Sequence, residues 1–190
     1  MDPVSEVQRQ LGNLIRIGTV ADLDLGSGRC RVRTGEVVTD FLPWLAPRAG
    51  DCSEWSAPSV GEQGVVLCPG GDTHGAVFLR GLYSDAMPAP ACGSSLHVVR
   101  FPDGAQVRYD HDAHSLQALL PSGGTAEITA DGGVTINGPL TVNGDTTHNG
   151  DVDVTGTVTA DTDVLGGGKS LKNHKHTGIQ PGGGVSEPPQ

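Results

Sequence analysis

The sequence predicts an all-β protein in which a small N-terminal barrel is followed by a β-meander and by a β-helix wound from three chains. Three observations favour this fold. Apolar residues make up 36% of the 190 residues and aromatic residues only 4%, which is thin for a large compact core. The 29 glycines and 13 prolines suit short strands joined by many turns. Glycine also recurs every six residues from Gly132 to Gly156.

Residues 1–13 are predicted to form a short helix. Pro3 fits the first helical turn, and Gly12 fits its end. The apolar face of this helix comprises Val4, Val7 and Leu11. A helix of this length is not stable alone, so we expect it to dock on a neighbouring body or on a partner.

Residues 14–85 are predicted to form a small β-barrel. The runs that predict its strands are 14–24, 29–34, 37–45, 62–71 and 75–83. Five short strands with a long loop after the third are typical of an OB-fold-like barrel. That loop, residues 46–61, holds Trp55, and Trp44 lies just before it. We favour packing of both tryptophans on the barrel or on neighbouring copies over a role in a binding loop.

Residues 86–96 are rich in proline, alanine and serine and are predicted to be a linker. Residues 97–131 are predicted to form a β-meander neck, because alternating runs are separated by turn signals such as Pro102-Asp103-Gly104. Its expected strands are 97–101, 105–112, 115–121 and 125–130.

The glycine-spaced hexads of residues 132–165 are predicted to form a triple-stranded β-helix. An apolar residue lies two and four positions after most of the glycines, so both side chains of a pair face one side of a short strand. Asn-Gly or Thr-Gly then provides a corner. The pairs are Val134/Ile136, Leu140/Val142, Val152/Val154 and Val158/Ala160.

Two architectures share a six-residue period. A single-chain left-handed β-helix needs about three hexads per turn and carries about one inward aliphatic residue per hexad. This segment has about five hexads, each with two inward positions. We therefore favour an intertwined homotrimer in which each chain contributes one strand to every layer.

One hexad departs from the apolar pattern, because Thr146 and His148 occupy its inward positions. Two interpretations remain open: a frayed or water-filled polar layer, which we favour, and an axial ion site lined by three copies of each residue.

Residues 166–190 are predicted to form a metal-binding apex and a flexible tail. His174 and His176 are two residues apart, so in an extended segment their imidazoles point to one side. Three chains around an axis would offer six imidazoles, which suits an octahedral divalent metal such as iron or nickel better than zinc. A second group, Asp110, His111, Asp112 and His114, is predicted to be a solvated turn.

Charge and cysteine content exclude other classes of protein. The formal net charge of −10 disfavours nucleic acid as a partner, and the arginines of 29–34 lack interleaved aromatics. The polar first ten residues predict no export signal, and no apolar run is long enough to span a membrane. The four widely spaced cysteines are therefore expected to be reduced.

Nearly the whole chain resembles the baseplate assembly protein V family, the central spike of contractile phage tails. The most specific segments are residues 134–145, V-T-I-N-G-P-L-T-V-N-G-D, and residues 170–178, S-L-K-N-H-K-H-T-G. Type VI secretion spikes are related in architecture.

The resemblance implies a homotrimeric, membrane-piercing needle without enzymatic activity. Its barrel would attach to tail hub and baseplate proteins, and its β-helix would pierce the host outer membrane. One iron ion per trimer would be held by His174 and His176 of three chains. The protein would then sit at the virion tail tip after assembly in the host cytoplasm.

Two alternatives to a phage spike are a spike of a related contractile-injection or type VI secretion system and a hexapeptide-repeat acyltransferase. The second is less favoured, because it needs more coils and a catalytic histidine, for which His148 is the candidate.

Overall fold

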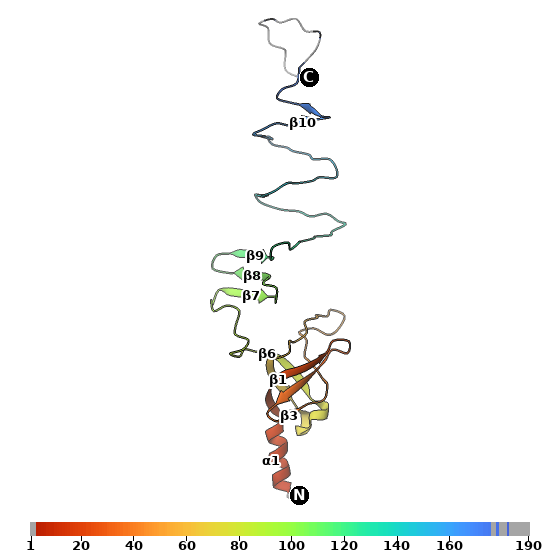
Figure 1. Cartoon of the computed structure of the whole chain (residues 1–190), viewed down its shortest axis with the longest axis vertical. Helices are drawn as coiled ribbons and strands as arrows, with labels where there is room; N and C mark the ends of the chain where they lie inside the picture. The colour runs from red at the N-terminus through yellow and green to blue at the C-terminus, as the bar shows by residue number, and fades with distance from the viewer. Residues whose placement is uncertain (1–2, 176–177, 179–181, 183–190) are drawn as a thin grey trace. The chain divides into compact units, whose positions relative to one another are not determined.

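The computed structural model describes residues 3–175, 178 and 182 of the chain. The chain divides into two compact units, Met1–Ile128 and Thr129–Gln190. The first unit holds one α-helix, a closed β-barrel and a three-stranded sheet, and the second ends in a small hairpin (Figure 1). The described residues are therefore mostly strands and loops, which confirms the predicted all-β class.

Helix α1 (Pro3–Asn13) precedes the barrel and touches it at one end. A Cβ atom at Gly71, in the 3₁₀ turn η1 (Pro69–Gly71), would lie 2.6 Å from the Cα of Gln10, so only glycine permits this approach. The face of Val4, Val7 and Leu11 is more than half exposed. In the described part of the chain, no helix has the length and apolarity that crossing a membrane requires.

The barrel is built from one antiparallel sheet in the order β3-β2-β1-β5-β6, with β4 paired to β2. Strand β1 is long enough to pair with both β2 and β5. The strands are β1 (Ile15–Asp24), β2 (Arg29–Thr34), β3 (Val37–Val38), β4 (Leu42–Pro43), β5 (Gln63–Leu67) and β6 (Val77–Leu82).

A parallel contact closes the barrel. Trp44, just after β4, forms a parallel bridge with Phe78 of β6, and the Leu45 amide donates to the Phe78 carbonyl at 2.9 Å. The expected single strand over 37–45 is wrong in one respect, since it is split into β3 and β4. Between them the Thr39 hydroxyl accepts from the Val32 amide at 3.0 Å and so replaces a backbone partner in the ladder.

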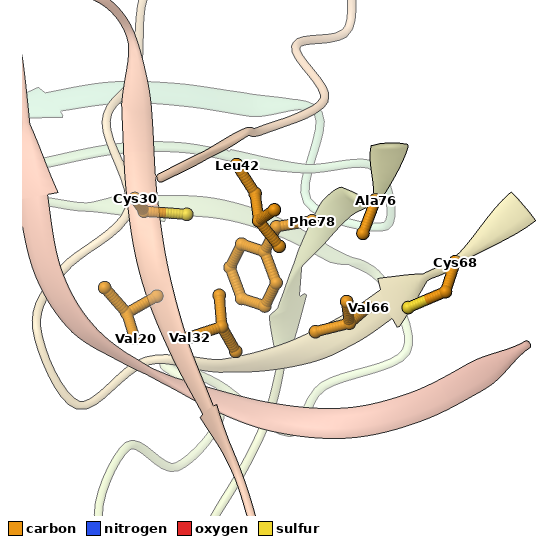
Figure 2. Packing of buried hydrophobic residues seen from close by; sticks show 8 residues of the cluster. All are labelled: Val20, Cys30, Val32, Leu42, Val66, Cys68, Ala76 and Phe78. Atoms are coloured by element: carbon orange, nitrogen blue, oxygen red, sulfur yellow. The ribbon is translucent and has the colours of Figure 1, made fainter. Parts of the chain in front are cut away.

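The barrel core is small and aliphatic, and the Phe78 ring lies in the middle of it (Figure 2). Two glycines allow the strands to pack this closely. A Cβ at Gly64 would lie 2.6 Å from Cε2 of Phe78, and a Cβ at Gly18 would meet the Val32 side chain. The buried residues are Val20, Cys30, Val32, Leu42, Val66, Cys68, Ala76 and Phe78.

Strands β7 (Leu96–Arg100), β8 (Gln106–Asp110) and β9 (Ser115–Leu119) form the antiparallel meander. One face of this sheet is apolar and exposed, and we call it the open apolar face: Val99, Val107, Tyr109 and Leu116. On the opposite face Arg108 and Gln117 are half-buried, and the Arg108 Nε donates to Gln117 Oε1 at 2.8 Å. The sheet thus leaves its apolar side uncovered within one chain.

The expected strand at 125–130 and the short strands of the hexads are absent from the single chain as described. Figure 1 shows residues 129–163 as extended runs that reverse direction repeatedly. A strand is stable only when a neighbouring strand accepts and donates its backbone hydrogen bonds, and among the described residues no strand is assigned within this segment. Gly138 and Gly144, which follow asparagine in consecutive hexads, have φ of +148° and +151°, a region that other residues avoid.

Candidate metal centre

The segment before the predicted metal ligands is a tight β-hairpin. Strands β10 (Leu165–Gly166) and β11 (Lys169–Ser170) pair, with Leu165 opposite Ser170. Gly167 and Gly168 make the two-residue turn with φ of +57° and +77°, as a type I′ turn requires. The Leu171 amide extends the ladder by donating to the Val164 carbonyl at 2.9 Å.

The carboxylate of Asp163 ties both ends of this hairpin together. Its Oδ1 accepts from the amide of Val164 at 2.8 Å and from the amide of Lys172 at 3.2 Å. The Ser170 hydroxyl and these backbone amides stabilise the charged form and hold the pKa of Asp163 below its ordinary value. Sequence reasoning missed this residue. Its position just before V-L-G-G-G-K-S does not by itself distinguish it from Asp161.

His174 is positioned by the turn that follows the hairpin. The Asn173 amide donates to the Ser170 Oγ at 2.8 Å, which shapes residues 170–173 into a turn. The ring nitrogen Nδ1 of His174 lies 2.9 Å from the Leu171 carbonyl oxygen. A carbonyl only accepts, so Nδ1 is the protonated ring nitrogen of the neutral imidazole, and Nε2 is the ring nitrogen with the chemistry of a metal ligand.

These residues fit the predicted metal site, although one chain cannot complete it. Metal-bound histidines commonly donate their other ring N–H to a backbone carbonyl, as His174 does to Leu171. Within the described ranges no group of three or more histidine, cysteine or acidic side chains could hold an ion. The second predicted ligand, His176, lies outside the described residues.

Thr146 and His148 lie in the hexad segment, and both are exposed in the single chain. The chain brings neither of them into a cluster of metal-ligating side chains among the residues that the structure describes. Their role as an axial layer therefore stays a prediction.

The acidic and histidine residues at 110–114 form a turn between β8 and β9. Asp110 Oδ1 accepts from the amides of Asp112 at 3.0 Å and Ala113 at 3.2 Å, and these bonds with the Ser95 side chain lower the Asp110 pKa. The Asp110 carboxylate thus stabilises the turn by accepting its backbone amides, in agreement with the predicted solvated corner.

The barrel's arginines and tryptophans likewise serve its structure. Arg29 donates to the Phe41 carbonyl at 3.1 Å, and Arg31 donates to the Thr39 carbonyl at 3.0 Å. The Trp44 and Trp55 rings pack with centroids 5.5 Å apart and planes inclined by 59°. The arginine pair therefore braces the β2–β4 region.

Two protein families match this chain, one near its N-terminus and one at its C-terminal end. Residues 16–83 match the OB domain of type VI secretion system and phage-baseplate injectors, and residues 170–190 match the GpV apex motif. The apex match contains the Ser170–Leu171 turn and His174 described above.

A curated relative agrees with both matches. The spike protein of Escherichia phage P2 is 45% identical over 133 residues, which cover 70% of this chain and 62% of that protein. The alignment thus spans less than two thirds of the relative. The chain thus carries an injector-type OB domain and a GpV apex motif, and over 70% of its length it is similar to a phage spike protein.

Proposed function

We propose that this chain is the structural spike of a contractile phage tail baseplate and acts as a homotrimer. The observation that carries the proposal is the exposure of the hexads. Their aliphatic side chains are 48% to 69% exposed in one chain: Val134, Ile136, Leu140, Val142, Val152, Val154 and Val158. Full burial of one such side chain stabilises a fold by about 1.5–3 kcal/mol, so the lone chain leaves much of the stabilisation that its hexads could contribute unused.

Association of three copies is the simplest way to bury the aliphatic side chains of the hexads and to pair their backbone groups. Each chain then supplies a strand to every layer, the aliphatic pairs turn to a shared axis, and backbone groups pair between chains. The open apolar face of the meander supports the same assembly, since Leu116 is 73% exposed on it. A second and a third chain would cover this face at the same threefold axis.

The shape of such an assembly suits mechanical work. Intertwined chains cannot slide apart without unfolding, and a shaft with paired edges is stiff and narrow. We propose that the trimer pierces the host outer membrane when the tail contracts, and that it performs no catalytic turnover. In this view the protein resides at the virion tail tip after assembly in the host cytoplasm.

The two ends of the chain would have different partners. The OB barrel, with its docked helix α1, would attach the spike to hub and baseplate proteins. At the apex, His174 and His176 of three chains would hold one iron ion per trimer through six imidazoles. The bound ion would supply a crosslink among the three chains where strand pairing ends.

A second candidate function is a spike of a type VI secretion or related injection machine. One observation favours it, because the OB domain matched at 16–83 is described for both kinds of injector. The two candidates share the trimer and the apex and differ in the particle that carries them.

Immunoelectron microscopy of phage particles that contain this chain distinguishes them. Antibodies raised against residues 132–165 should label the end of the tail at the baseplate. Label along the tail tube, or none on particles whose other baseplate proteins are present, would contradict the phage-spike proposal.

A further inference from the structure

Two backbone amides and the Ser170 side chain bind one carboxylate, that of Asp163, which is not a predicted ligand. Asp163 lies before β10, yet its Oδ1 binds the amide of Lys172, nine positions later and beyond β11. It therefore joins the two ends of a hairpin that is itself only two residues long on each side. So short a hairpin is not stable in water without further support.

A continuous chain of bonds leads from this carboxylate to the histidine ring. Asp163 holds the amides of Val164 and Lys172 and contacts the Ser170 side chain. Ser170 Oγ in turn accepts from the Asn173 amide at 2.8 Å. The same turn presents the Leu171 carbonyl to Nδ1 of His174 at 2.9 Å.

Each hydrogen bond in this series restricts the position of the group that forms the next one. The Leu171 carbonyl fixes the tautomer and direction of the His174 ring, and its own position depends on the turn 170–173. That turn is attached to the hairpin through residues that Asp163 binds. Charge-assisted bonds from backbone amides to a carboxylate are among the stronger hydrogen bonds in proteins.

We infer that Asp163 is the positioning residue of the apical metal site: its carboxylate clamps the β10–β11 hairpin and thereby sets the orientation in which His174 is offered to the ion. This inference rests on the proposed apical site. It adds a residue outside the histidine pair and outside the matched apex segment, which begins at residue 170.

The test compares three variants of the full-length protein. Asp163→Ala removes the clamp, and Asp163→Asn keeps one carbonyl oxygen for the Val164 and Lys172 amides. Asp161→Ala is the matched control, because it removes the same charge two residues earlier from an exposed position. All are purified as assembled protein, and subunit number and iron content are measured by native mass spectrometry.

Three further readouts separate positioning from general stability. Iron release to a chelator should be about 10- to 100-fold faster in Asp163→Ala, near wild type in Asp161→Ala, and partly restored in Asp163→Asn. In metal-stripped protein, amide hydrogen exchange at Val164 and Lys172 should lose protection only when the carboxylate is removed. The visible spectrum of cobalt-substituted protein should also change in Asp163→Ala, since it reports the ligand field directly.

The outcomes are distinguishable from failure of the proposed function. Wild-type trimer without any metal would refute the apical site itself. Wild-type iron, with unchanged release and an unchanged cobalt spectrum in Asp163→Ala, would overturn the role of Asp163. Lost amide protection with unchanged iron release would also overturn it, since the clamp would then not reach His174. If Asp163→Ala does not assemble, the same comparison is made with Asp163→Asn.

Discussion

At the scale of single residues, His174 shows how backbone geometry prepares a side chain for a ligand. Its Nδ1 is held 2.9 Å from the Leu171 carbonyl oxygen, and this contact selects the tautomer with the lone pair on Nε2.

Replacement of His174 and His176 by alanine should abolish bound metal while the trimer persists, because the hexads and meander still join the chains. The measurement is iron content and subunit number by native mass spectrometry. His111→Ala is the control, since this exposed histidine lies in the β8–β9 turn. Metal retained in the double variant would exclude these two residues as the ligands.

The sequence could nominate His174 because an H-x-H pair has a recognisable spacing. It could not nominate Asp163, since the carboxylate acts on amides that become neighbours only once the hairpin closes. A single aspartate in a glycine-rich segment carries no periodic signal that separates it from Asp161. His176 lies outside the described residues, so its role stays a prediction.

At the scale of elements, the barrel depends on glycines that let strands approach closely. Gly64 lies on β5 opposite Arg80 and against the Phe78 ring, with no room for a methyl group. Extra volume in a packed core forces side chains and strands to move.

Gly64→Ala should therefore lower the free energy of unfolding by about 1–3 kcal/mol, the usual range for overpacking. Gly50→Ala is the matched control, because a Cβ there would meet nothing within 4 Å. Urea denaturation followed by tryptophan fluorescence measures both. Equal urea midpoints for the two variants would show that the barrel accommodates a methyl group at position 64 without losing stability.

Strand prediction succeeded best in the barrel, where local turn signals separate the strands. The runs 14–24 and 29–34 are confirmed as β1 and β2, since alternation and the Gly26–Gly28 turn are local signals. The run 37–45 is split, because the tertiary contacts of Thr39 and Trp44 override a continuous alternation. The run 125–130 is wrong as a fourth meander strand, since the sheet ends at β9 and residues 125–130 form no strand beside it.

At the scale of the whole molecule, the main question is what covers the apolar surface that one chain leaves open. The exposed rows lie on the meander and on the hexads, in both units of the chain. The net charge of −10 does not cover these aliphatic rows, and exposed apolar rows of this kind favour association with a complementary apolar surface.

Val142→Asp should prevent trimer formation. Three carboxylates would meet near a dry axis, where unpaired like charges are strongly unfavourable. Asn143→Asp is the matched control, because the adjacent side chain faces outward in the proposed β-helix. Sedimentation velocity of both variants measures the effect. A normal trimer from Val142→Asp would show that this position faces solvent and that the hexad register is different.

Native mass spectrometry of the untagged full-length protein tests the central claim most directly. The account predicts one species that contains three 19.5 kDa chains and one transition-metal ion. Three chains without metal would keep the intertwined spike and remove the apical site. A single chain at micromolar concentration would contradict the account, because the exposed aliphatic rows of the hexads would then need no partner.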